Sequence, residues 1–115
     1  MALPTDRPVY QAEIEAEIIR LLGEIENEVL PQLAQISEEA SIAEVKYKVE
    51  HAKAYLKAQG PTATRNAHAV VESGDQLLDR VITDRGVTTV REKLHAYEAS
   101  IDALRTLLVG TRNQT

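Results

Sequence analysis

The feature that most constrains the fold is a regular series of apolar residues in the C-terminal part of the chain. Its members recur at alternating steps of three and four residues: Val87, Val90, Leu94, Tyr97, Ile101, Leu104 and Leu108. We call this series the heptad seam, because such spacing is typical of a helix that packs along its length on another helix. Left exposed, it would be a large apolar patch for a monomer. We therefore expect either the first helix or a second copy of the chain to cover it.

The composition agrees with an all-α chain of long helices. The 115 residues include no Phe, Trp or Cys and four Tyr, so Leu, Ile, Val and Ala must form the core. These side chains suit close contacts between helices that lie side by side. The lack of Cys excludes disulfides and thiolate chemistry. No apolar run is long enough to span a membrane and the start lacks a signal-peptide pattern, so we expect a cytoplasmic protein with no membrane contact.

The N-terminal residues predict an acidic first helix. Pro8 suits a first helical turn, and apolar residues then recur at helical steps as far as Ile36. We predict a helix over about 7–38 with a kink near Pro31, because proline removes a backbone donor and clashes with the preceding turn.

A second helix is predicted over 42–59. Ser41 and Glu44 have the spacing of a capping box, which marks a helix start. The helix ends at Gly60-Pro61, where glycine can take a left-handed conformation and proline cannot continue the helix.

A third helix is predicted over 62–109, either continuous or broken near Gly86, where the apolar spacing changes. With a turn at Gly60-Pro61, the second and third helices form an antiparallel hairpin. The predicted fold is a single all-α domain, a three- to four-helix bundle with coiled-coil-like packing.

The second helix has two semi-apolar faces. One face is predicted to pack on the third helix: Val45, Val49, Ala52 and Leu56. The opposite sector carries Tyr47, His51 and Tyr55, and a lysine strip lies between the two faces: Lys46, Lys53 and Lys57. We take Lys46, Tyr47, Lys53, Tyr55 and Lys57 as the candidate partner-binding surface.

Charge is unevenly distributed along the chain. Residues 1–40 carry a net charge of −7, residues 41–65 carry +3 and residues 66–115 carry −1. Either the acidic first segment packs beside the basic second one, or the basic segment binds an acidic partner.

No pattern predicts catalysis. Glu92 and His95 have the spacing that places a carboxylate and an imidazole on one helix face, but di-iron bundles need two such pairs and two further glutamates. We find no nucleophile elbow or phosphate-binding glycine loop. We therefore predict a non-enzyme, with no catalytic residue, no metal ligand and no cofactor.

Two segments resemble a family of small helical phage and prophage proteins, most familiar from actinobacteria. The matching positions are Tyr47, Ala52, Lys53, Ala54, Leu56, Ala58, Gly60, Leu104, Arg105 and Thr106. The resemblance covers about 70 residues and implies an accessory role near phage replication and recombination, in the cytoplasm of a bacterial host. It implies no catalytic residues.

These observations favour a small phage-related interaction protein that acts as an accessory or adaptor through protein–protein contacts. We expect a homo-oligomer, with a dimer favoured, and a protein partner of unknown identity. One alternative is direct nucleic-acid binding, with lysines on phosphates and tyrosines stacked on bases. The other is a scaffolding role in virion assembly.

Overall fold

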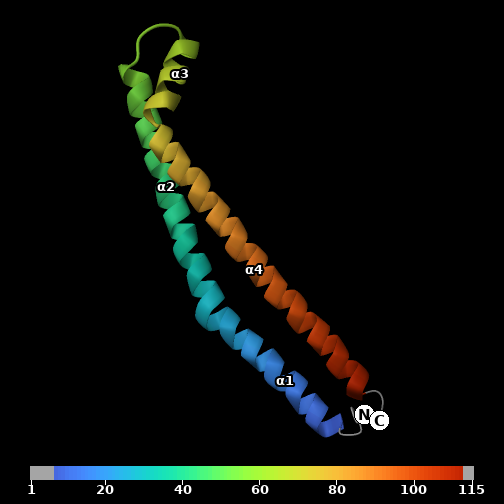
Figure 1. Cartoon of the computed structure of the whole chain (residues 1–115). Coiled ribbons are helices and arrows are strands. Elements are labelled where there is room, and N and C mark those ends of the chain that lie inside the picture. Colours follow the sequence, from blue (N-terminus) through green and yellow to red (C-terminus); the bar gives the residue numbers. More distant parts are fainter. Residues whose placement is uncertain (1–6, 113–115) are drawn as a thin grey trace. The chain divides into compact units, whose positions relative to one another are not determined.

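The computed structural model describes residues 7–112, which form an all-α structure without strands (Figure 1). The helices are α1 (Arg7–Glu24), the π-helix η2 (Ile25–Val29), α2 (Leu30–Lys57), α3 (Thr62–Glu72) and α4 (Gly74–Arg112). The predicted fold class is confirmed. The chain divides into two compact units, which are described separately. We call Met1–Gln32 with Val90–Thr115 the terminal unit, and Leu33–Thr89 the central unit.

The central unit contains the predicted chain reversal at Gly60-Pro61. Gly60 has a φ of +106°, a left-handed conformation that glycine adopts without steric cost. Arg65 of α3 reaches back across the turn and donates hydrogen bonds from Nε and Nη2 to the backbone oxygen of Tyr55, at 3.2 and 3.1 Å. This oxygen is one of the last four carbonyls of α2, which need partners from outside the helix. Arg65 therefore ties the end of α2 to the start of α3.

The face of α2 that pairs with the returning helices is the opposite of the predicted one. Ala40, Ala43 and Ala54 are buried, whereas Val45 and Leu56 are 60% and 75% exposed. The prediction is wrong because it ranked faces by apolar side-chain size. Alanine allows two helix backbones to approach closely, so a face of small side chains makes the contact.

Helix α4 is continuous at Gly86, and this glycine lies close to α2. A Cβ atom added to Gly86 would lie 3.0 Å from Cδ1 and Cγ1 of Ile36 on α2. The Ile36 side chain would therefore have to shift by a few tenths of an ångström to admit a Cβ atom at this position. The pairing face of α4 continues through the partly buried Arg80 and Thr83, two polar positions that a search for apolar spacing passes over.

The interruption in the predicted helix 62–109 lies at Ser73 instead. Ser73 is fully buried, and its Oγ donates a hydrogen bond to the backbone oxygen of Ala69 at 2.6 Å. The residue has φ −98° and ψ 19°, outside ideal helical values, and separates α3 from α4. A serine that bonds to the preceding turn in this way is known to bend helices.

The predicted helix start at residue 42 is also wrong. α2 runs from Leu30 to Lys57 without interruption, and Ser41 lies in its interior. The Ser41 hydroxyl donates to the backbone oxygen of Ser37 at 3.0 Å rather than accepting from a free N–H of a new helix. The capping-box spacing occurs here by coincidence, since no Gly or Pro near it stops the preceding helix.

Pro31 produces the predicted disturbance as a π-helical turn. η2 occupies the five residues directly before Leu30, whose N–H bonds to the oxygen of Ile25. A π-turn inserts one extra residue and removes the clash that proline would otherwise cause. The burial pattern records this insertion, because the inward positions Ile25, Val29 and Leu33 are spaced four and four rather than four and three.

In the terminal unit, α1 covers the heptad seam. The buried core is Ile14, Ile18, Leu21, Ile101 and Leu108, with Tyr10, Ile25, Tyr97 and Leu104 packed against it. Of the two alternatives expected to cover the seam, the structure shows the first helix of the same chain within this unit. Among the helices of residues 7–112, none is both long and apolar enough to cross a membrane.

Candidate functional site

The two tyrosines of the predicted partner-binding surface face the interior of the central unit. The guanidinium carbon of Arg65 lies 4.3 Å from the centre of the Tyr55 ring, and that of Arg80 lies 5.4 Å from the centre of the Tyr47 ring. Both are cation–π contacts. The Tyr47 ring also lies 5.8 Å from the ring of His51. Contacts within the chain therefore already occupy these rings, which weakens the prediction that they stack on bases.

The three lysines of that surface are exposed. Lys53 pairs with Glu50 at 3.5 Å. Lys53 and Lys57 also line a polar groove of about 100 Å³ with Glu50 and the α3 residues His68 and Glu72. The carboxylates in this groove offset part of the positive charge, so the lysine strip is less basic than the sequence indicates.

The more conspicuous surface of the central unit is apolar and lies on the outer side of α2. It comprises four large side chains, which we call the α2 stripe: Ile42, Val45, Val49 and Leu56. Their exposed fractions are 48, 60, 44 and 75%. At 100° per residue, these positions point about 180° from the buried alanines. The sequence identified three of these four residues as one face, but assigned that face to the core.

Lysines border the α2 stripe on both sides. Lys46 and Lys53 lie at one edge and Lys48, which precedes Val49, lies at the other, as the helical turn of 100° per residue requires. Lys48 pairs with Glu44 at 3.1 Å, an exposed ion pair that lowers the pKa of the Glu44 carboxyl through its hydrogen bond to Lys48. The stripe is therefore an apolar surface edged by lysines, of which Lys48 and Lys53 are paired with glutamates of the same helix.

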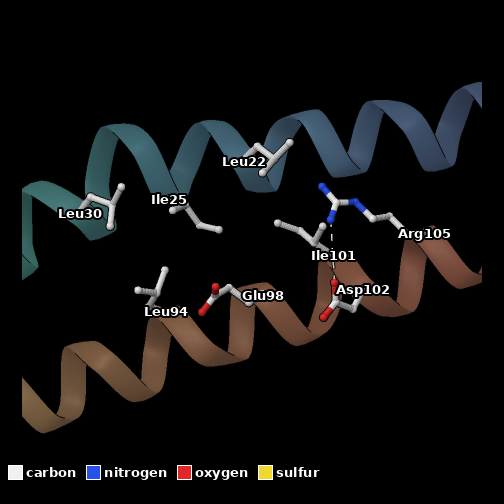
Figure 2. Close-up of a pocket in the computed structure, with 8 residues that line it drawn as sticks. All are labelled: Leu22, Ile25, Leu30, Leu94, Glu98, Ile101, Asp102 and Arg105. Atoms are coloured by element: carbon white, nitrogen blue, oxygen red, sulfur yellow. Dashed lines mark ion pairs between the residues drawn. The ribbon is translucent and has the colours of Figure 1, made fainter.

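The terminal unit has its own candidate site, an open groove of about 420 Å³ beside the π-turn. Its residues are Leu22, Ile25, Leu30, Leu94, Glu98, Ile101, Asp102 and Arg105 (Figure 2). We call it the terminal groove. Figure 2 shows apolar side chains from both ribbons between the two helices, with Glu98, Asp102 and Arg105 on the α4 side. The volume is within the range of roughly 300–1,000 Å³ for binding pockets in proteins.

The surroundings of the terminal groove are acidic. The Tyr97 hydroxyl donates a 2.6 Å hydrogen bond to Glu24, and this bond, with the charges of Glu24 and Glu28, raises the pKa of the phenol. Arg20 pairs with Glu24 at 2.5 Å and also with Glu17, and the hydrogen bond from Arg20 lowers the pKa of the Glu17 carboxyl. The Tyr97–Glu24 bond joins the end of α1, directly before the π-turn, to α4, and the Arg20 pairs lie within α1.

The acidic rim of the groove is on α4. Arg105 and Asp102 form an exposed ion pair at 3.9 Å, so the positive charge of the lining is close to a carboxylate. Glu98 adds a second carboxylate, which leaves the rim with a net negative charge.

The predicted oligomer seam lies mainly inside the terminal unit. Val90, Ile101 and Leu108 are buried, and the other four are partly buried: Val87, Leu94, Tyr97 and Leu104. Only Val87 belongs to the central unit. Because α1 covers this series within the chain, an oligomer that uses it would have to displace α1. The oligomeric state itself stays a prediction.

Within residues 7–112, no three His, Asp or Glu side chains come together in a way that could hold a metal ion. Glu92 and His95 are both exposed. The two candidate sites described above are surfaces: the α2 stripe and the terminal groove. The sequence did not predict the groove, because it forms where α1, the π-turn and α4 meet.

Comparison with known proteins gives no relative: no family model, curated protein or solved structure matches the chain.

Proposed function

We propose that this protein is a non-enzymatic interaction protein that binds an apolar surface of another protein molecule along the α2 stripe. The observation that supports this proposal is the high exposure of four large apolar side chains at heptad spacing, on the side of α2 that faces away from its intramolecular partner. A contiguous apolar surface rimmed by polar residues marks an interaction site in soluble proteins.

The spacing and the charges of the α2 stripe indicate what kind of partner surface it would bind. A helix that lies in an apolar surface presents residues at steps of three, four and seven, and the α2 stripe has the same spacing. Lys46, Lys48 and Lys53 at its edges favour a partner with acidic residues beside its own apolar series. Lys46 and Lys53 of the predicted surface keep their role in this proposal. Lys48 replaces Lys57, and stripe residues replace Tyr47 and Tyr55. The resemblance to phage proteins makes an accessory role in a bacterial cytoplasm the proposed setting.

Photocrosslinking tests this function with a partner of any identity. A photoreactive amino acid replaces Ala52, which is exposed and lies within the stripe series, and the protein is irradiated in the cells that produce it. The matched control carries the same group at Thr88, an exposed position of α4 in the same unit. We expect a discrete crosslinked product from position 52 and not from position 88.

The double substitution Val45→Ser and Val49→Ser should abolish that product and leave the circular dichroism of the helices unchanged, since both side chains are exposed. If no discrete product forms at position 52, or if the product persists in the double variant, the α2 stripe is not the binding surface.

A further inference from the structure

We propose that the α2 stripe of one molecule binds the terminal groove of a second copy of the chain. This inference rests on the proposed function, because it identifies the molecule that the stripe binds. The two surfaces differ in shape and in charge: one is a projecting helix face edged by lysines, the other an open groove with carboxylates at its rim. Every molecule carries both surfaces.

The groove is long enough to hold two helical turns of the α2 stripe. The groove extends along α4 from Leu94 to Arg105, about 16 Å at 1.5 Å per residue. The part of the stripe from Ile42 to Val49 extends about 10 Å by the same measure, so two helical turns of it fit within the groove. Leu30 in the lining is 45% exposed, so apolar surface is available for the contact.

The charges of the two surfaces also match. Lys46 and Lys53 edge the stripe, and the groove offers Glu98 and Asp102 at its rim. The segment 7–32, which supplies one wall of the groove, carries six Glu and two Arg. Complementary charges at the edge of an apolar contact speed association and exclude wrong partners.

The same charges argue against the simplest alternative, a symmetric contact between two α2 stripes. In that arrangement, lysines of one copy would face lysines of the other, and like charges across an interface are unfavourable. A contact through the heptad seam is also disfavoured, because α1 already covers its buried members within the terminal unit. The groove offers opposite charge beside exposed apolar side chains.

A contact between two different surfaces has a consequence for assembly. One stripe bound in one groove leaves a second stripe and a second groove available. A reciprocal contact then closes the pair into a dimer, or further copies add to the ends.

Sedimentation velocity of purified full-length chains tests this inference. The wild type is measured from about 1 µM to about 1 mM, which covers the dissociation constants of small but specific interfaces. The stripe variant carries Val45→Ser and Val49→Ser, and the groove variant carries Leu30→Ser and Glu98→Lys. All four side chains are exposed, and circular dichroism checks that the helices are retained.

We expect the wild type to associate as concentration rises, and each variant to associate at least about tenfold more weakly, from the loss of partly buried apolar contacts. An equimolar mixture of the two variants should recover a complex of two chains, because one contributes an intact groove and the other an intact stripe. A control variant with Val71→Ser and Leu78→Ser, exposed apolar positions on α3 and α4, should associate like the wild type.

A wild type that stays monomeric over the whole range overturns the inference. So does an association that survives either variant, or a mixture of the variants that stays monomeric. If photocrosslinking at position 52 nevertheless captures a different protein, the proposed function stands and only its identification with a second copy fails. If position 52 captures nothing, both fail.

Discussion

Replacing Gly86 with alanine should destabilise the protein, although alanine is the better helix former. Gly86 lies inside α4, where Gly→Ala normally adds about 1 kcal/mol to the free energy of unfolding. Here the new Cβ would lie 3.0 Å from two atoms of Ile36, so the facing helix or its side chain must move. Overpacking of this kind costs roughly 1–3 kcal/mol. The net expectation is a loss of up to about 2 kcal/mol.

A double-mutant cycle separates the two effects. In an Ile36→Ala background the obstructing atoms are gone, so Gly86→Ala should then stabilise by about 1 kcal/mol. The coupling energy between the two positions should be about 1–3 kcal/mol, measured by urea denaturation followed by circular dichroism. The matched control is Gly23→Ala in α1, where a new Cβ meets nothing within 4 Å.

If Gly86→Ala stabilises the native sequence as much as Gly23→Ala does, steric contact with Ile36 is not the reason for the glycine. A coupling energy near zero between positions 36 and 86 would lead to the same conclusion, because the close approach of α2 and α4 would then not explain the glycine.

Three further substitutions test other parts of the structure. Ala54→Leu, on the buried face of α2, should lower the free energy of unfolding in chemical denaturation by roughly 1–3 kcal/mol. Ala52→Leu, on the exposed face, should change it by less than about 0.5 kcal/mol, and equal effects would contradict the observed pairing face. Deleting Asn27 from the π-turn together with Pro31→Ala should keep a cooperative urea transition, because the deletion restores heptad spacing; a lost transition would show that the π-turn itself is required. The Tyr97 phenol has a raised pKa in the folded protein, so its contribution to stability is complete below its unfolded pKa of about 10 and declines as pH rises through the folded pKa. Tyr97→Phe should therefore make the urea midpoint fall less steeply with rising alkaline pH. An unchanged dependence of the midpoint on pH would contradict the bond to Glu24.

Several parts of the fold can be predicted from the sequence because they depend on local chemistry. Gly60-Pro61 ends one helix and turns the chain, since few other residue pairs combine a left-handed conformation with a stop to the helix. Pro31 disturbs the helix one turn before itself, as its missing donor requires. The heptad seam is a true packing face, with Ile101 only 3% exposed.

The face of α2 could not be predicted by the same reasoning. Its larger apolar side chains are at Val45, Val49 and Leu56, and apolar size normally identifies the buried face. In this chain the facing helix contributes Gly86, which lies close to Ile36 of α2, and the buried positions of α2 in the central unit are alanines. A sequence shows both candidate faces but not the separation of the helices, which decides between them.

The candidate sites divide in the same way. Lys46 and Lys53 at the edge of the stripe were identified from their helical positions, and their exposure agrees with that identification. Tyr47 and Tyr55 were placed on the same surface, but arginines distant in sequence cover their rings. The terminal groove combines residues from both ends of the chain, and no local pattern indicates which of them meet.

The division of the chain into two units also determines the order in which the structure can form during synthesis. The central unit is one continuous segment, Leu33–Thr89, so its helices can pair as soon as that segment has left the ribosome. The terminal unit joins two distant segments, and α1 must wait until residues 90–112 have been made. During that interval Ile14, Ile18 and Leu21 have no cover from α4. The nascent protein therefore exposes its first helix to chaperones and to neighbouring chains until residues 90–112 have been made.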